Sequence, residues 1–349
     1  MIANVSQNDP ICSVPENLEF GFWMFQTSPF IVAPIYSIAV YLLVYHSGIH
    51  AKRIRIIYLR NLALNVICML IMSIVLCPIF YLPMIGYQSN GLIRFVPLNL
   101  AFPAILTVYC LLGVVISIMN LFHYRLKAIS SMNTSPRNLQ IRTFLQRLVY
   151  ITYFILVSTA ISYLGLLTVQ SSQPTIKPMI FEKYHMSEVW CPKFLVSDPY
   201  SWPIILAICT TFIFIIFVGS VVLLCGAFTL IILLASRKDL SEHTLKVQKK
   251  FTTVLIVQAA VHVVFILGPI ITIVASVYFD IYINDGGLVF FFVEAHQGTA
   301  STLVFISTHS VTKKSLNYAF SRVRKFMGLK NSNSIWSVSK VELRSKSVV

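Results

Sequence analysis

Ionisable side chains are rare inside the long apolar stretches of this 349-residue chain, and they gather in the first half of the last one. Glu294 is the single acid in any such stretch, and His296 and Gln297 follow it closely. An ionisable group in an apolar segment is costly to keep, so it indicates a functional site. Glu294 could pair with a cationic ligand, with a histidine, or with a structural hydrogen-bond network, and the sequence leaves these three interpretations open.

Two more polar residues lie within apolar stretches and could face the same site. Tyr109 lies midway along the third stretch, and His262 lies in the sixth. The candidate ligand-binding residues are therefore Tyr109, His262, Glu294, His296 and Gln297.

The residue patterns typical of catalysis are missing from the sequence. It contains no glycine-rich phosphate loop after a strand, no Gly-x-Ser-x-Gly elbow and no His-Glu-x-x-His. The eight histidines are scattered, without the spacing of metal ligands. We therefore expect neither an enzyme nor a metal site nor a cofactor.

Two modifications are indicated that involve residues near the N-terminus, Asn4 and Cys12. Of the seven cysteines, only Cys12 and Cys191 lie outside the apolar stretches, where they could form a disulfide or remain free thiols. Asn4 begins an Asn-Val-Ser sequon, which could be glycosylated or unused. Both alternatives stay open for each site.

The elements that position these residues are membrane helices. The chain is 57% hydrophobic and only 11% charged, against about 25% charged in a soluble domain. A bilayer-crossing helix needs about 20 mostly apolar residues, and seven stretches meet that need. They are 23–45, 62–84, 95–122, 148–169, 203–235, 252–279 and 288–308. The predicted fold class is an all-α membrane protein, a seven-transmembrane helix bundle in residues 23–308 with an amphipathic eighth helix.

The chain has a net charge of +15, and the placement of its basic residues indicates its orientation in the membrane. Lys and Arg alternate between rich and poor from one connection to the next, so that 23 of the 27 lie on one side of the membrane. Because basic loops stay cytoplasmic, residues 1–22 are expected outside and the tail, 309–349, inside. The chain is then a multi-pass plasma membrane protein, and nucleic acid is not needed to explain the charge.

The inner side of this bundle has three features that suit a signalling partner. Arg125 ends the third stretch and Lys246, Lys249 and Lys250 precede the sixth, so all four are candidate contacts for a G protein. Arg125 could equally be an ordinary basic helix end. Basic and apolar residues alternate at helical spacing over 312–329, which predicts a helix in the membrane interface. It could be a receptor's eighth helix or a generic membrane-surface helix.

Pro269 should bend the sixth stretch. Such a bend would suit a bundle that opens at its inner end. It would equally suit a static kink, because proline is common in membrane helices.

Several segments resemble nematode serpentine chemoreceptors, most closely the class H receptors of the Str superfamily, with class I as the alternative near the end of the last stretch. The segments 240–244, 248–251 and 255–258 resemble the start of helix 6 in that family. The prolines and glycines Pro78, Pro83, Gly86 and Gly91 resemble its pattern after helix 2. Phe122 and Arg125 fit the end of its helix 3, and Gly298, Ser301 and Thr302 fit its helix 7 motif.

The sequence also departs from that pattern. His123 and Tyr124 stand where the family has an acid and an asparagine, His262 replaces a proline, and Gln297 replaces a histidine. The family's Pro-Tyr-Arg after the last stretch is replaced by residues 310–313. The missing acid beside Arg125 removes the usual partner for an ionic lock.

The resemblance implies a chemosensory G-protein-coupled receptor in sensory-neuron cilia. It would bind an external small molecule or peptide between the outer ends of the third, fifth, sixth and seventh helices and activate a heterotrimeric G protein. A ligand-gated channel and a small-solute transporter are the alternatives.

Overall fold

The structure is a computed structural model that describes residues 12, 14–46, 52–130, 136–235, 241–281 and 286–308. The chain divides into two compact units, Met1–Phe305 and Ile306–Val349, and only residues 306–308 of the second are described. Everything else described belongs to the first unit. Asn4 and the predicted helix 312–329 lie outside the described residues.

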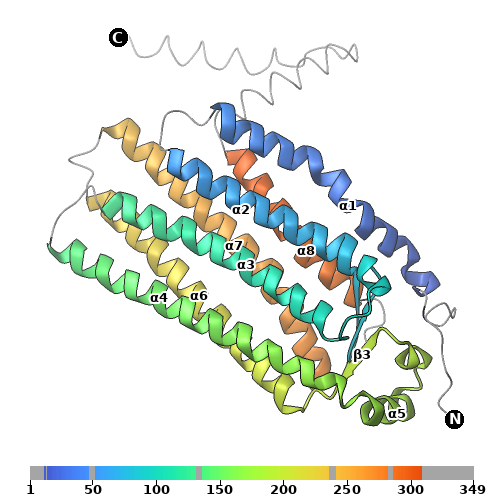
Figure 1. Cartoon of the computed structure of the whole chain (residues 1–349). Helices are drawn as coiled ribbons and strands as arrows, with labels where there is room; N and C mark the ends of the chain where they lie inside the picture. Colours follow the sequence, from blue (N-terminus) through green and yellow to red (C-terminus); the bar gives the residue numbers. More distant parts are fainter. Residues whose placement is uncertain are drawn as a thin grey trace, which may run out of the picture. The chain divides into compact units, whose positions relative to one another are not determined.

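Within the described residues, seven helices are long and apolar enough to cross a membrane, which confirms the predicted seven-transmembrane bundle (Figure 1). They are α1 (Glu16–Tyr41), α2 (Lys52–Leu70), α3 (Phe102–Ser130), α4 (Pro136–Leu164), α6 (Trp202–Ala235), α7 (Glu242–Tyr278) and α8 (Gly286–Thr308). Short π-helical extensions lengthen α1 and α2, namely η2 (Leu42–His46) and η3 (Ile71–Leu76).

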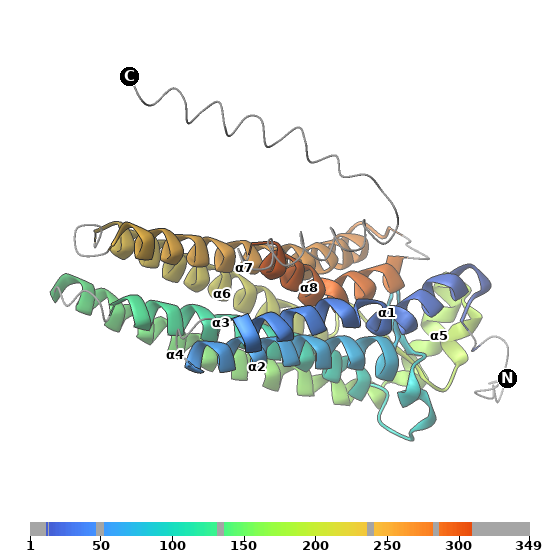
Figure 2. The same ribbon diagram turned by 90° about the horizontal axis from the view of Figure 1, so that it is seen from above.

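The bundle is built around α3, which packs against α2, α4 and α6, while α6 also packs against α4 and α7 (Figure 2). Large apolar side chains also point away from the bundle. Phe30 on α1, Ile216 on α6 and Val264 on α7 are each about two-thirds exposed or more. A bilayer solvates such surfaces, so the chain can be apolar on both faces of a helix.

The second span ends earlier than predicted. The expected helix 62–84 stops at Leu76, and Pro78–Tyr81 is the strand β1 instead. The backbone of Cys77 adopts a left-handed conformation (φ 37°), which closes the helix through a hydrogen bond from its N–H to the Met72 carbonyl (2.8 Å). Pro78 and Pro83 then lack the N–H groups that a continuing helix requires. The apolar run continues from the helix into the strand, so composition alone did not predict where the helix ends.

The third span starts later than predicted. The expected helix 95–122 begins at Phe102 and runs to Ser130, while Leu92–Phe95 is the separate 3-10 turn η4. Asn99 forms a turn just before this start, because its side-chain oxygen accepts a hydrogen bond from the Ala101 N–H (2.9 Å).

Two connections form a cap over one end of the bundle, the end at which α1 begins (Figures 1 and 2). We define the cap as residues 77–101, between α2 and α3, and 165–201, between α4 and α6. It contains a three-stranded antiparallel sheet in the order β1 (Pro78–Tyr81), β2 (Ile85–Ser89), β3 (Phe194–Ser197). The helix α5 (Gln173–Tyr184) and the 3-10 turns η5 (Gly165–Gln170) and η6 (Ser187–Trp190) complete it. The sequence predicted helices only, so this small sheet is an addition to the predicted helix bundle.

The edge of the sheet is closed by one side chain. Gln173 donates a hydrogen bond to the Val196 carbonyl (2.7 Å) and accepts one from the Val196 N–H (3.0 Å). Its amide therefore pairs β3 as a further strand would, although it comes from α5. This contact ties α5 to the sheet and satisfies backbone groups that are buried.

Candidate functional site

A cavity of about 230 Å³ lies beneath the cap, lined by α3, α4, α6, α7 and α8. Phe80, Tyr87 and Leu195 from the three strands form part of its roof. Most of its wall is aliphatic or aromatic. The polar lining residues are Tyr87, Thr107, Tyr163, Ser197, Thr211 and Glu294. This is the architecture of a small-molecule site, concave and apolar with a few placed polar groups.

Glu294 is the only charged residue among the described residues that line this cavity. It lies in the third turn of α8 and is 4% exposed, one turn further along the helix than the lining residue Phe291. Residues three apart share a helix face, so both side chains meet the cavity. No described residue forms a hydrogen bond or ion pair with the Glu294 carboxylate.

The neighbouring histidines do not pair with it. His262 and His296 each donate a hydrogen bond from Nδ1 to the backbone carbonyl four residues earlier, of Gln258 and Phe292 respectively (2.8 Å each). The His296 ring also stacks on Phe292, with ring centroids 4.2 Å apart. Neither histidine forms the pair with Glu294 that the sequence allowed.

Four of the five predicted ligand residues lie off the cavity wall. His296 is two residues beyond Glu294 and so faces another side of α8, and Gln297 lies one turn further from the cap. His262 likewise lies one turn below the lining residue Ile266 of α7. Tyr109 on α3 turns toward α4, where its hydroxyl donates to the Ala160 carbonyl (3.0 Å). Only Glu294 among them lines the cavity.

The polar wall residues that the sequence analysis did not single out come from five elements, namely β2, α3, α4, β3 and α6. Tyr163 of α4 and Thr211 of α6 share a hydrogen bond (2.7 Å), and Thr107 of α3 donates to the Pro103 carbonyl (3.0 Å). Burial raises the pKa of Tyr87 in the roof, so its phenol stays neutral. Isolated hydroxyl residues within apolar spans could have indicated these wall positions. The sequence, however, did not show which face of its helix each of them occupies.

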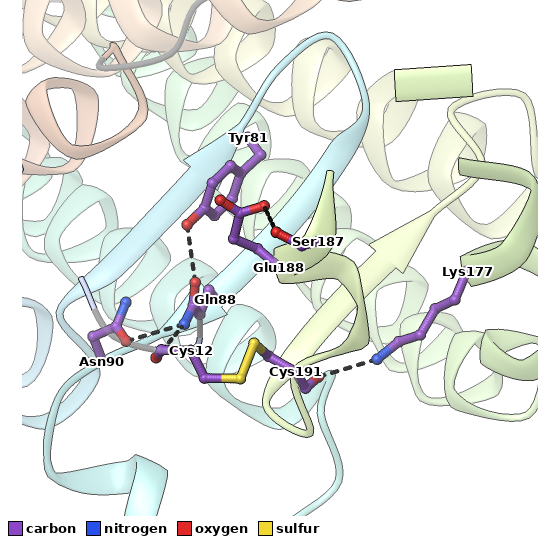
Figure 3. The surroundings of a disulfide bond; sticks show 8 residues. All are labelled: Cys12, Tyr81, Gln88, Asn90, Lys177, Ser187, Glu188 and Cys191. Carbon is purple, nitrogen blue, oxygen red and sulfur yellow. Dashed lines mark hydrogen bonds between the residues drawn. A yellow bond between two sulfur atoms is a disulfide. The ribbon is translucent and has the colours of Figure 1, made fainter. Parts of the chain in front are cut away.

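A disulfide joins Cys12 to Cys191 in the cap, with Cα atoms 5.5 Å apart (Figure 3). Gln88 of β2 donates to the Cys12 carbonyl (3.2 Å) and accepts from the Tyr81 hydroxyl (2.9 Å). Lys177 of α5 donates to the Cys191 carbonyl (3.1 Å). The N-terminal segment, the sheet and α5 are thereby linked above the cavity.

A second polar cluster lies toward the other end of α3. Arg125 is buried and donates hydrogen bonds to Gln248 of α7, through both its backbone carbonyl (3.3 Å) and its side-chain oxygen. Its guanidinium also lies over the ring of Phe251, 4.4 Å from the centroid, and Tyr58 of α2 packs edge-on against that ring. Arg125 therefore holds α3 to α7 through neutral partners.

The other predicted inner residues are differently placed. Lys246, Lys249 and Lys250 are exposed on the first turns of α7. Pro269 lies inside α7, between the cavity residues Ile266 and Ile270. No group of three or more potential metal-ligating residues occurs in the described parts of the chain.

A family model of the serpentine type 7TM GPCR chemoreceptor Srh matches residues 18–321. The chain belongs to the Srh chemoreceptor family. This family lies within the Str superfamily of nematode chemoreceptors, which confirms the resemblance drawn from the motifs. No curated protein and no solved structure matches the chain.

As an Srh chemoreceptor, the chain is a membrane receptor of a non-enzymatic family. The cavity and the cluster around Arg125 are then its two candidate sites, at different ends of α3. Gln248, which holds Arg125, lies in a segment that resembles the family, but the sequence analysis did not single it out as a site residue.

Proposed function

We propose that this chemoreceptor binds an external small molecule in the cavity beneath the cap and activates a heterotrimeric G protein at the opposite end. The observation that carries the proposal is the cavity itself, which the third, fifth, sixth and seventh membrane helices (α3, α6, α7 and α8) share with α4 and the cap. Its volume of about 230 Å³ favours a small molecule over a peptide.

The cap is the extracellular side in this proposal. The Lys and Arg bias places the N-terminus outside, and a disulfide between Cys12 and Cys191 is at home in an oxidising compartment. Plasma-membrane and ciliary location follow from the chemosensory role. Epitope tags on each terminus of intact cells test the orientation, and a cytoplasmic N-terminus would favour a channel instead.

Signalling requires α7 to move. Pro269 offers no N–H to the Phe265 carbonyl, so α7 has a weak point beside the cavity residues Ile266 and Ile270. A ligand that favours the arrangement with α7 displaced shifts the receptor toward it. That displacement breaks the contacts of Arg125 with Gln248 and Phe251, and frees Arg125 for the G protein beside Lys249 and Lys250.

A filled cavity tests the ligand site. Ala207 is buried on α6 and lines the cavity, whereas Ile213 on the same helix is exposed. Ala207→Phe should lower the potency of an activating cue, found by screening odorants and small peptides, by tenfold or more. Ile213→Phe is the matched control and should leave it unchanged. Equal responses of the two variants at equal surface expression would refute the cavity as the ligand site.

The inner face has its own test. Arg125→Ala combined with Lys249→Ala and Lys250→Ala should retain ligand binding and lose ligand-stimulated guanine-nucleotide exchange. Survival of that exchange would show that the G protein docks elsewhere. In the wild type, guanine nucleotide should lower agonist affinity, a coupling that a transporter would lack.

A further inference from the structure

We propose that the cavity takes small apolar amines, whose ammonium group pairs with the carboxylate of Glu294. This inference rests on the proposed function, since it names the ligand class for the same cavity. It combines three features: a buried acid with no partner, a wall without basic groups, and an apolar volume of limited size.

The acid has no partner of its own. Glu294 is 4% exposed and lines the cavity, yet no described residue donates a hydrogen bond to its carboxylate. A buried carboxylate that lacks a partner loses its hydration without compensation, which is unfavourable. A cation brought in by a ligand would restore the missing pairing in a place where water screens it poorly.

The neighbouring histidines do not pair with Glu294 in this structure. The two nearby histidines use Nδ1 on backbone carbonyls, and His296 is stacked on Phe292. The single ion pair among the described residues joins Lys183 and Asp280, both largely exposed. The structure thus supplies no cation for Glu294 from within the part of the chain that it describes.

The rest of the wall selects against other charges and favours an apolar body. No basic residue is among the described residues that line the cavity, so an anionic ligand would meet only the like charge of Glu294. The hydroxyls of Thr107, Tyr163 and Thr211 already take part in hydrogen bonds within the protein. Phe80, Phe212 and Phe291 offer aromatic surface to the ligand's carbon skeleton.

The volume limits the ligand. Sites for drug-sized molecules usually have about 300–1,000 Å³, and this cavity has about 230 Å³. An alkylamine or an arylalkylamine with a single ring matches this volume better than a larger polyamine or a peptide.

The test compares matched probes on the full-length receptor in nanodiscs. Propylamine, hexylamine and 2-phenylethylamine are each paired with the alcohol and the carboxylate of the same carbon skeleton, and ligand-dependent melting temperatures give the affinities at pH 7. At least one amine should bind more tightly than its alcohol and its carboxylate. This comparison needs no variant, so it does not depend on how Glu294 substitutions fold.

Variants then assign the effect to one carboxylate. Glu294→Gln should weaken amine binding about 30-fold or more, because removing one partner of a buried charge pair costs at least ~2 kcal/mol, and should leave alcohol binding unchanged. Glu182→Gln makes the same chemical change on the exposed face of α5 and should alter neither. Amine binding that survives Glu294→Gln would overturn the inference.

The outcomes separate this inference from the proposed function. If alcohols or carboxylates bind as well as amines and Ala207→Phe blocks them, the cavity is the ligand site but its ligands are not amines. If no amine binds, the amine inference is likewise overturned. If Ala207→Phe leaves cue-evoked signalling unchanged, the cavity is not the ligand site and the proposed function fails with it.

Discussion

Arg125 links α3 to α7 through the amide of Gln248 and the ring of Phe251. The sequence places it at the inner end of α3 without the acid that would hold an ionic lock. The structure supplies a neutral amide and an aromatic ring from α7 instead. A guanidinium can use both kinds of partner, since it donates in a planar fork and stacks on aromatic faces.

Gln248→Ala should therefore raise ligand-independent guanine-nucleotide exchange. A hydrogen bond to a charged group stabilises its state by ~1.5–3 kcal/mol, so its loss from the closed arrangement should increase basal activity about tenfold or more. Thr253→Ala removes an exposed hydroxyl of the same helix, which donates to the Lys249 carbonyl, and should change nothing. Unaltered basal exchange in Gln248→Ala membranes would mean that this contact does not hold α7 closed.

Lys177 gives the cap a defined pH dependence. Burial lowers its pKa from 10.5 to about 8 in the folded protein. Between pH 8 and 10.5 the unfolded chain binds the proton that the folded chain has lost, so this residue makes the receptor more stable as pH rises through that range. The melting temperature of the wild type relative to that of Lys177→Met should therefore rise across this pH range. Lys183→Met, on the exposed side of α5, should retain it.

The helix α5 and the strand β3 are joined through Gln173, whose amide satisfies both backbone groups of Val196. Gln173→Leu keeps the size of the side chain but leaves a buried N–H and a buried C=O unpaired. Each such group costs ~1–3 kcal/mol, so we expect a lower melting temperature and faster hydrogen exchange in β3. Gln170→Leu is the comparison, because it removes an exposed hydrogen bond from the Leu100 N–H (3.2 Å) and leaves β3 untouched. Similar exchange in both variants would show that Gln173 does not secure the edge.

The helices α2 and α8 approach each other closely at Gly298. A Cβ added there would lie 2.5 Å from the Asn65 Cβ, which is closer than packed atoms allow. Gly298→Ala should force the two helices apart and reduce the yield of folded receptor at the cell surface. Gly219 on α6 has nothing within 4 Å of an added Cβ, so Gly219→Ala should be harmless. Equal surface yields of the two alanine variants would contradict this packing.

At the scale of the whole molecule, the Cys12–Cys191 disulfide closes a long loop of the chain, because the two cysteines are 179 residues apart in the sequence. A cross-link over so long a loop removes much chain entropy from the unfolded state, and losing such a bond typically costs ~2–5 kcal/mol. The double variant Cys12→Ala, Cys191→Ala should therefore melt at a clearly lower temperature. Cys209→Ala replaces a free, exposed cysteine of α6 and should melt as the wild type does. A double variant as stable as Cys209→Ala would show that the bond contributes little.

Sequence alone determined the number and the order of the membrane helices. Length, hydropathy and charge are properties of local segments, and the bilayer requires each crossing segment to be apolar over about 20 residues. The same reasoning failed at helix ends. Apolar runs continued past Leu76 into β1, where Phe80 lines the cavity, and began before Phe102, where Phe95 is apolar although it is exposed. Apolar composition alone therefore did not mark where these helices begin and end.

Only the tertiary structure decided which polar residues meet. Helical periodicity places His296 on another face of α8 than Glu294 and Gln297 at another depth, and it turns Tyr109 toward α4. Their spacing in the chain did not show which of these residues would line the cavity. The cavity is assembled from five helices and three strands that are distant in sequence. Its composition depends on how the helices are rotated about their axes, and a membrane sequence that is apolar on every face leaves that rotation undetermined until the helices pack.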